Sequence, residues 1–500
     1  MGLGSTLLKG SFIRTTNVFL QIAAAFVMTP YIVHSLGDRM YGIWVLVGTF
    51  FGYYGLLDFG LSTAVTRYIS RAVGTDDKKE INEVVNTSII LYSIVGIVVI
   101  VVSILAMYFS QWFIESANEV DLFRKIVAML GLSMAVGFPV RVFGGVLDAN
   151  LRYDLSCYAS ITKLIVANTV IIFLLKSGFG ILALSSASFL AGMLEYSLIV
   201  MFAKKTCPFI QLRRTFFNRS IVKQLFSYSG KSFVAQLGDL LRFRVDAIVI
   251  AGFLNAGMVT YYSIGARFVE YFGMIMISAT GMMGPVFSQY EGRGDYEGIR
   301  ERFLEVTHLS VILSVFIGAS IMFYSKWFIA RWMGPGYESS YYVCVILCIS
   351  STIALMQTSG IGLLYGISKH HYYAIANTCE GILNLILSLI LVRYYGIYGV
   401  ALGTMIEMLL FKLFIQPMFI CRAIELSVYR YYFKTIFVTT IKSLLPLLLY
   451  FYAIKDLVKA EYSSIIIFGF IQSLLFALIT YTFILDKTKK QQIRSVLKHV

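Results

Sequence analysis

The stretch VVNTSIILYSIVGIVVIVVSILAMYFS, residues 84–110, contains no charged side chain and decides the fold class. A helix of this length extends about 40 Å at 1.5 Å per residue, enough to cross a hydrocarbon core of about 30 Å. Backbone groups in lipid need partners within the protein, and the stretch lacks the alternating hydrophobicity of a barrel strand. It therefore predicts a transmembrane α-helix.

The remaining chain has the same character. Hydrophobic residues make up 58% and charged residues 14% of the 500 residues, and the mean hydropathy is +0.77. Soluble domains usually carry about 25% charged residues. The sequence therefore predicts an all-α integral membrane protein of about fourteen transmembrane helices. They are expected over residues 11–34, 41–66, 84–110, 124–147, 155–176, 179–203, 224–252, 257–287, 303–330, 340–366, 371–393, 397–420, 433–454 and 462–485.

The formal net charge of +15 reflects 42 Lys and Arg against 27 Asp and Glu. The basic residues gather at alternate ends of the predicted helices, on the side of the N-terminus, which is the positive-inside pattern. We therefore expect a multi-pass protein with both termini in the cytoplasm, and we expect no nucleic-acid partner. The densest basic stretch carries Lys204, Lys205, Arg213, Arg214, Arg219 and Lys223.

The chain also repeats itself at a constant offset of 218 residues. One ungapped offset aligns both loops and helix starts. The repeat spans six predicted helices, so we expect two six-helix lobes related by a pseudo-two-fold axis along the membrane normal. These lobes would cover 1–220 and 221–425, with two additional transmembrane helices and a basic cytoplasmic tail at 426–500. Matched pairs include Leu36 and Leu254, Met40 and Met258, Asp77 and Asp295, and Gly178 and Gly396.

Charged residues inside predicted helices are the candidate site residues, because an ionisable group at bilayer depth usually faces a cavity or a partner. In the seventh helix Lys231, Asp239, Arg242 and Asp246 fall on one stripe, whereas Arg244 lies on another face. The stripe predicts the wall of a water-filled cavity. It is equally compatible with a self-paired helix in which Arg242 and Asp246 form an i,i+4 ion pair.

Other intramembrane charges give weaker signals. Arg267 and Glu270 are spaced as an i,i+3 pair that could be purely structural, and Arg14 could snorkel to the interface. Lys163 has no obvious local partner, which makes it a stronger candidate for the cavity. The remaining acids could carry a coupling proton or could pair with Lys412 or Lys442. These acids are Asp58, Glu195, Glu380 and Glu407.

Sequence motifs for catalysis or cofactor binding are not convincing. Gly230-Lys231-Ser232 resembles the end of a P-loop, but Leu225 occupies the position of its first glycine. His370-His371 has no acid or cysteine at metal-ligand spacing. We expect no catalytic residues, no metal site, no cofactor and no enzymatic activity.

The segment PYIVHSLGDRMYGIWVLVGTFFGYYGLLDFGLSTAVTRY, residues 30–68, resembles the opening of polysaccharide-type flippases. These belong to the multidrug/oligosaccharidyl-lipid/polysaccharide exporter superfamily. Likeness is carried by Leu36-Gly37, Tyr41-Gly42, Leu57-Asp58-Phe59-Gly60 and Arg67-Tyr68, and by Val245-Asp246-Ala247-Ile248 in the second half. The resemblance extends nearly from end to end, including the count of about fourteen helices.

This resemblance implies two lobes that open alternately to the two sides of a bacterial inner membrane. Such flippases, which include those for O-antigen, the surface part of lipopolysaccharide, pass the head group of an undecaprenyl-diphosphate-linked oligosaccharide through a central cavity. Arg242, Lys163, Arg267, Arg14 and Lys231 would then line the cavity and hold the diphosphate. Asp58, Asp239, Asp246 and Glu270 would act as coupling or pairing acids. H+ or Na+ would be the coupling ion, and a polysaccharide polymerase would be a candidate partner.

Other members of the superfamily remain alternatives. Lipid II flippases share the fourteen helices and the cavity arginines. Multidrug exporters usually have twelve helices and an acidic coupling residue in the first helix, where this chain has neither Asp nor Glu. A membrane-embedded glycosyltransferase would need acidic catalytic groups in a large loop, which the sequence lacks.

Overall fold

The computed structural model describes most of the chain, and the described residues are helical without a strand. They comprise seventeen α-helices and several short 3-10 or π-helical turns. Within these described residues, eleven segments are long and apolar enough to cross a membrane. The described residues are 3–112, 117–227, 229, 245–280, 283–367, 369, 371–485 and 490.

These eleven segments account for twelve of the predicted helices. The segment Ile375–Ala423 contains two of them, because Gly396 (φ 57°, ψ −135°) reverses the chain inside α15 (His371–Leu410). The predicted eighth helix corresponds to α10 (Ala256–Thr280). The predicted seventh, 224–252, falls largely outside the described residues and is seen at its end as α9 (Val245–Phe253). A helical multi-pass membrane fold is therefore confirmed, while the pseudo-two-fold axis stays a prediction.

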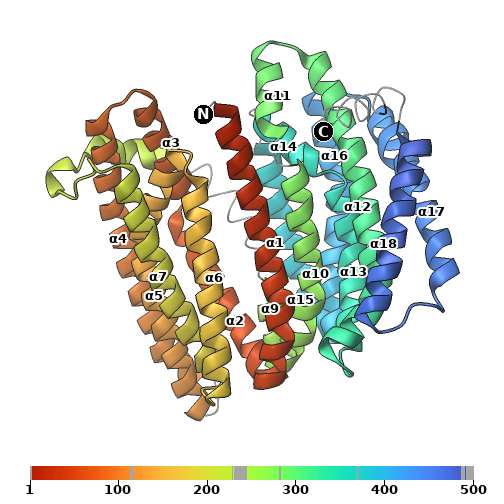
Figure 1. Cartoon of the computed structure of the whole chain (residues 1–500), viewed down its shortest axis with the longest axis horizontal. Helices are drawn as coiled ribbons and strands as arrows, with labels where there is room; N and C mark the ends of the chain where they lie inside the picture. The colour runs from red at the N-terminus through yellow and green to blue at the C-terminus, as the bar shows by residue number, and fades with distance from the viewer. Residues whose placement is uncertain are drawn as a thin grey trace. The chain divides into compact units, whose positions relative to one another are not determined.

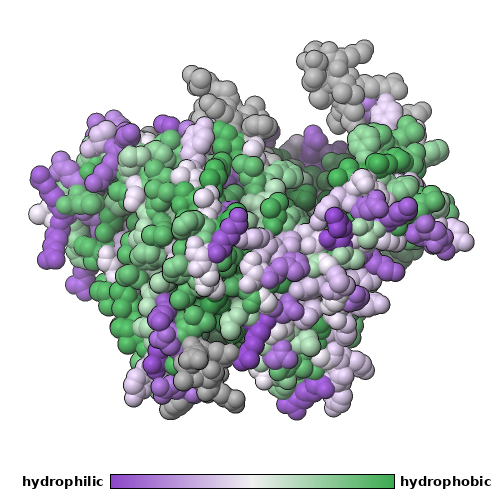
Figure 2. All heavy atoms as spheres, turned by 60° about the horizontal axis from the view of Figure 1, so that its bottom comes forward, coloured by the Kyte–Doolittle hydropathy of each residue, from purple (hydrophilic) through white to green (hydrophobic). Residues whose placement is uncertain are grey.

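The surface of the helices is hydrophobic, as lipid contact requires. Along α18 (Tyr462–Ile479), Ile466, Phe470 and Leu474 follow one another at four-residue spacing, and each is more than half exposed. Figure 2 shows wide continuous hydrophobic areas on the face that it presents. In water such a surface would promote aggregation, whereas in a bilayer it is solvated by lipid tails.

The chain divides into two compact units, Met1–Leu240 and Leu241–Val500 (Figure 1). In the first unit α5 is central, since it contacts α3, α4 and α7. The helices of this unit are α1 (Leu3–Leu36), α2 (Asp38–Tyr54), η1 (Gly55–Asp58), α3 (Leu61–Gly74), α4 (Lys78–Tyr108), η2 (Phe109–Trp112), α5 (Ala117–Ala149), α6 (Tyr153–Lys176), α7 (Leu182–Thr206) and η3 (Arg214–Phe216).

Small residues bring α4 and α5 close together. A Cβ atom added to Gly96 would stand 2.6 Å from the carbonyl oxygen of Ala135, so only glycine fits there. On the same interface the rings of Tyr92 and Phe138 stack at 6.1 Å. Close backbone approach is a common device between helices in lipid, where no hydrophobic effect drives their association.

The predicted helix 41–66 is wrong in its second half. The chain leaves α2 through η1, turns left-handed at Phe59 (φ 49°) and Gly60 (φ 73°), and starts α3 at Leu61. Glycine tolerates this conformation at low cost, and the Asp58 carboxylate accepts the backbone N–H of Ser62 in the first turn of α3. The predicted helix 340–366 is likewise divided, into α13 (Glu338–Leu355) and α14 (Thr358–Gly366).

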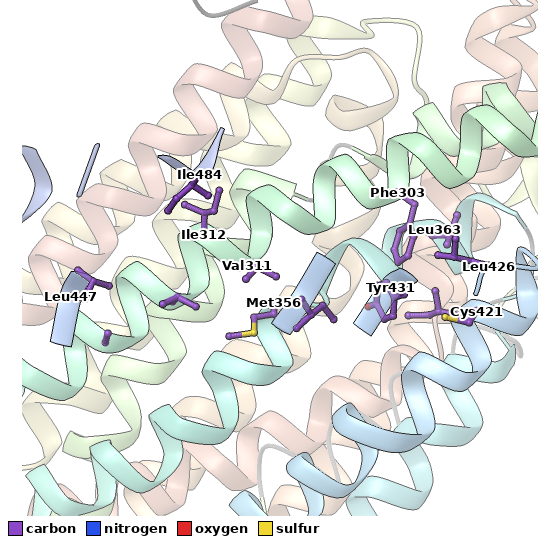
Figure 3. Packing of buried hydrophobic residues seen from close by; sticks show 14 of the residues in the cluster. Phe303, Val311, Ile312, Met356, Leu363, Cys421, Leu426, Tyr431, Leu447 and Ile484 are labelled. Atoms are coloured by element: carbon purple, nitrogen blue, oxygen red, sulfur yellow. The ribbon is translucent and has the colours of Figure 1, made fainter. Parts of the chain in front are cut away.

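The second unit includes the last two transmembrane helices within its core. Its remaining elements are α11 (Met283–Gly292), α12 (Tyr296–Met333), η4 (Phe411–Ile415), α16 (Gln416–Ala423), η5 (Arg430–Phe437), α17 (Val438–Ile454) and η6 (Thr480–Ile484). Both α17 and α18 contact α12. Figure 3 shows how side chains from these helices, such as Tyr431, Leu447 and Ile484, join Phe303 and Ile312 of α12 in one buried cluster.

The internal repeat is visible in the turns. Asp77 caps the N-terminus of α4 by accepting the N–H groups of Lys79 and Glu80, and its counterpart Asp295 caps α12 by accepting the N–H of Gly298. The preceding residues, Asp76 and Gly294, both have positive φ. Gly178 (φ 81°) and Gly396 (φ 57°), also one offset apart, both reverse the chain between long helices. The same local structure therefore recurs at the same offset.

Candidate functional site

Lys163 lies near the middle of α6 and forms an ion pair with Glu195, near the middle of α7. Its Nζ is 2.8 Å from Oε2 of Glu195. Lys163 was expected to have no obvious local partner, and the partner that the structure shows lies on the next helix. The lysine side chain remains 44% exposed and the glutamate 16%. Lys163 thus keeps free surface with which it could bind an anion.

Close to this pair, polar side chains of α6 and α1 contact each other. Ser160, one turn before Lys163, accepts a hydrogen bond from Nε2 of Gln21 at 3.5 Å. The same amide donates to Oδ1 of Asn17 at 3.3 Å. Arg14 belongs to α1, but its side chain lies outside the described residues. Uncharged polar groups at bilayer depth near a cation suit hydroxyl-rich or phosphate-bearing ligands.

Asp58 is buried in a separate network of the first unit. Its Oδ1 accepts Tyr92 Oη at 2.6 Å and lies 3.2 Å from Nη1 of Arg141. Its Oδ2 accepts Ser62 Oγ at 3.0 Å. The Arg141 guanidinium also stacks over Phe138, 4.4 Å from the ring centroid. Asp58 thus joins η1, α3, α4 and α5, and its lone pairs are well occupied.

Asp246 is the central group of a buried polar cluster in the second unit. One carboxylate oxygen, Oδ2, accepts Tyr262 Oη at 2.5 Å and Thr404 Oγ1 at 3.3 Å. The other, Oδ1, is buried and has no hydrogen-bond partner among the described residues. Burying a carboxylate oxygen without a hydrogen bond costs free energy, so, as far as the described residues go, Oδ1 could accept a proton or a cation.

The reversal at Gly396 brings the other members of this cluster together. It folds the second part of α15 back on the first, and a Cβ at Gly403 would stand 3.0 Å from the backbone nitrogen of Ser388. Asn384 consequently donates to Thr404 Oγ1 at 3.1 Å, and Ser388 donates to Asn384 Oδ1 at 3.0 Å. The cluster therefore offers a carboxylate, an amide and three hydroxyls, the oxygen donors that suit H+ or a hard cation.

Another intramembrane ion pair joins Glu380 of α15 to Lys412 of η4, with 2.7 Å between Oε1 and Nζ. For Glu380, the alternative of pairing with Lys412 is thus confirmed. Lys412 Nζ also donates to Gln416 at 2.8 Å, and its carbonyl accepts Gln357 Nε2 at 2.6 Å. Tyr431 Oη donates to Gln357 Oε1 at 3.2 Å, which ties the additional helix to this network.

The Lys163–Glu195 and Glu380–Lys412 pairs occupy nearly equivalent positions of the repeat with opposite polarity. An offset of 218 carries Lys163 to within one residue of Glu380, and it carries Glu195 to within one residue of Lys412. Each pair joins the fifth and sixth predicted helix of its half. In the first half the cation is on the fifth helix, and in the second half it is on the sixth.

The remaining predicted site residues are placed only in part. Arg267 and Glu270 form the expected i,i+3 pair at 3.8 Å on α10. Lys231, Asp239 and Arg242 lie outside the described residues, so both interpretations of the seventh helix stay predictions. Sequence reasoning missed Tyr92, Arg141, Tyr262, Asn384 and Thr404. Arg141 carried a usable signal, because it is a charged residue inside the predicted helix 124–147. The other four are uncharged polar residues within apolar helices, a feature that many residues of this chain share.

Comparison with known proteins identifies the family. The model of the family described as "Polysaccharide biosynthesis protein" matches residues 7–291, and a second model, MatE, matches residues 232–390. The uncharacterized membrane protein EpsK of Bacillus subtilis is 22% identical over 420 residues, covering 81% of each chain. The putative O-antigen transporter of Shigella flexneri is 21% identical, covering 77% of this chain and 91% of that protein.

A solved structure supports the same assignment at the level of the fold. The lipid II flippase MurJ, in an inward closed conformation, aligns with a TM-score of 0.72 at 16% identity. The alignment covers 95% of this chain and 99% of MurJ. With a family model matching more than half of its residues, this multi-pass membrane protein belongs to the polysaccharide biosynthesis protein family.

Proposed function

We propose that the chain is a flippase that moves undecaprenyl-diphosphate-linked oligosaccharide repeat units from the cytoplasmic to the outer leaflet, for cell-surface polysaccharide biosynthesis. The observation that carries the proposal is the family match over residues 7–291, joined by similarity to an O-antigen transporter over 91% of that protein. The lobes 1–220 and 221–425 would alternate between inward and outward openings, while 426–500 would accompany the second lobe.

In this proposal the diphosphate is held by cations at bilayer depth. Lys163 supports the idea, because it lies in mid-membrane, carries polar neighbours on α1 and keeps 44% of its side chain exposed. Arg242, Arg267, Arg14 and Lys231 would supply the remaining charge. Guanidinium groups fit phosphate oxygens well, since they donate two parallel hydrogen bonds.

The cycle would be driven by H+ or Na+ bound at Asp246. Oδ1, which has no hydrogen-bond partner among the described residues, supports this assignment together with Thr404, Asn384 and Ser388. A cation there would neutralise the carboxylate and bridge α9 to both parts of α15. Binding would therefore alter the packing of these helices, as a coupling ion must do to favour one conformation.

A lipid II flippase is the second candidate, favoured by the likeness to MurJ over 95% of this chain. One experiment separates it from the first. The gene is deleted in its own host, lipid-linked sugars are assayed by membrane leaflet, and susceptibility to cationic drugs is measured in parallel. We expect oligosaccharide-lipid to accumulate on the cytoplasmic leaflet and a surface polymer to be lost.

Accumulation of lipid II with weakened peptidoglycan would instead favour the second candidate. Unchanged surface glycans with greater sensitivity to cationic drugs would contradict both and would identify a multidrug exporter.

A further inference from the structure

The segment that follows α7 is strapped to the side of α4 by a ladder of asparagines. Asn82 accepts the N–H of Gln211 at 2.8 Å, and Asn86 donates to the carbonyl of Gln211 at 2.8 Å. Asn86 also accepts the N–H of Arg213 at 2.9 Å. Residues 207–218, which we call the strap, are therefore held along their length although they form little regular structure.

The end of the strap is fastened as well. The backbone N–H of Asn218 donates to Thr87 Oγ1 at 3.0 Å, and its side-chain amide donates to Glu83 Oε2 at 2.7 Å. Thr87 and the two asparagines of α4 are buried. The carboxylate of Glu83 is thus engaged with the strap, and that of Asp77 caps α4.

The outer side of the strap and its flanks is strongly basic. Residues 204–223 contain no acidic residue, and all six of their basic side chains are exposed. Two large apolar side chains, Leu212 (54% exposed) and Phe217 (45%), lie among them. The basic side chains are Lys204, Lys205, Arg213, Arg214, Arg219 and Lys223.

The strap lies at the depth of lipid headgroups. It begins at the residue that follows the end of α7 at Thr206, and it contacts α4 between Lys78 and Thr87, within the first three turns. The 31 residues of α4 extend about 46 Å, which exceeds the hydrocarbon core of about 30 Å. The excess puts the first turns of α4, and the strap beside them, in the polar interface.

We propose that the strap is a docking surface for anionic phospholipid headgroups of the leaflet on its side. Fixed arginines would hold the phosphate through charge-assisted hydrogen bonds, and Leu212 and Phe217 would enter the acyl boundary. Because the asparagine ladder orders the backbone beforehand, binding costs less conformational entropy than it would for a loose basic loop. Docking would anchor this part of the first unit to the membrane surface.

The test uses the purified full-length chain in detergent, titrated with phosphatidylglycerol and, separately, with phosphatidylcholine. Bound lipids are counted by native mass spectrometry. We expect a clear preference for phosphatidylglycerol that weakens as salt is raised. The variant Arg213→Gln/Arg214→Gln should lose roughly 25-fold in affinity for phosphatidylglycerol, since each basic residue near a charged surface contributes about fivefold.

Two further variants separate the site from general charge. Lys455→Gln/Lys459→Gln removes two exposed cations from the α17–α18 loop and should leave the preference unchanged. Asn82→Ala/Asn86→Ala keeps every charge but releases the strap, so an intermediate loss is expected. An unchanged preference in the arginine variant, or an equal loss in the lysine control, would overturn the proposal. The readout is lipid binding, so its outcome is independent of transport.

Discussion

At the scale of single residues, the informative groups are charged side chains whose partners lie on another helix. Lys163 and Glu195 are 32 positions apart, and Asp246 and Thr404 are 158 apart. The sequence singled out Lys163 and Asp246 because charge is rare in apolar helices. It could not supply their partners, since helix-face geometry relates only residues a few positions apart.

Asp246 should be the group through which an ion gradient drives transport. In proteoliposomes with an imposed H+ or Na+ gradient, Asp246→Asn should lose gradient-driven flipping, because the amide keeps the shape but cannot bind a cation as a charged ligand. Glu270→Gln changes an exposed acid of the same unit and should remain gradient-driven. Gradient-dependent flipping in Asp246→Asn would contradict the assignment.

Variants of Lys163 can distinguish a role in binding phosphate from a role that is limited to holding α6 and α7 together. Lys163→Ala should abolish transport while the protein stays inserted and abundant. The exchange Lys163→Glu/Glu195→Lys restores an ion pair between α6 and α7 but moves the cation, so it should remain inactive. The readout is flipping of lipid-linked oligosaccharide, with surface abundance as the control. Wild-type transport in the exchanged protein would show that the pair serves only to join helices.

The Glu380–Lys412 pair should matter for stability. Both side chains are at most 5% exposed, so Glu380→Ala would leave a buried cation and should lower the free energy of unfolding by about 3–5 kcal/mol. The double variant Glu380→Leu/Lys412→Met removes both charges and should recover most of this loss. Thermal unfolding in detergent measures both. A double variant no more stable than the single one would argue that the pair itself, and not the orphaned charge, carries the energy.

At the scale of helices, length and hydropathy were sufficient to predict most transmembrane segments, since a span needs about 20 apolar residues. The breaks at Phe59-Gly60 and at Met356-Gln357 were not predictable in this way. The few polar residues at these breaks lie within long apolar stretches, and contacts such as that of Asp58 with Ser62 decide where a helix stops.

The close approach of α4 and α5 predicts opposite effects for two glycine substitutions. Gly96→Ala would force the backbone of Ala135 away and should destabilise the protein by about 1–3 kcal/mol. Gly144→Ala, inside α5, meets nothing within 4 Å and should stabilise it by about 0.5–1 kcal/mol. Chemical or thermal unfolding of the two variants side by side is the measurement. Equal effects would mean that the two helices can move apart freely.

At the scale of the whole molecule, the two additional helices are part of the second unit's core. Tyr431 stacks on Phe303 at 5.4 Å, and Phe476 stacks on Phe316 at 4.8 Å. A chain ending after Glu425 would expose this surface, so we expect it to aggregate or to be degraded. A chain ending after Lys490 keeps α17 and α18 and should accumulate normally. Gel filtration of the two truncated proteins tests this expectation. A monodisperse protein ending after Glu425 would contradict it.

The opposite polarity of the two ion pairs has a consequence for assembly. Because the halves share a helical pattern, a newly inserted helix could associate with the counterpart of its proper neighbour. If α6 met the sixth helix of the other half, Lys163 would face Lys412, and α7 against the other fifth helix would set Glu195 opposite Glu380. Like charges in lipid repel strongly. The opposite polarity of the two pairs should therefore disfavour these wrong helix pairings and favour association of each helix with its neighbour in its own half.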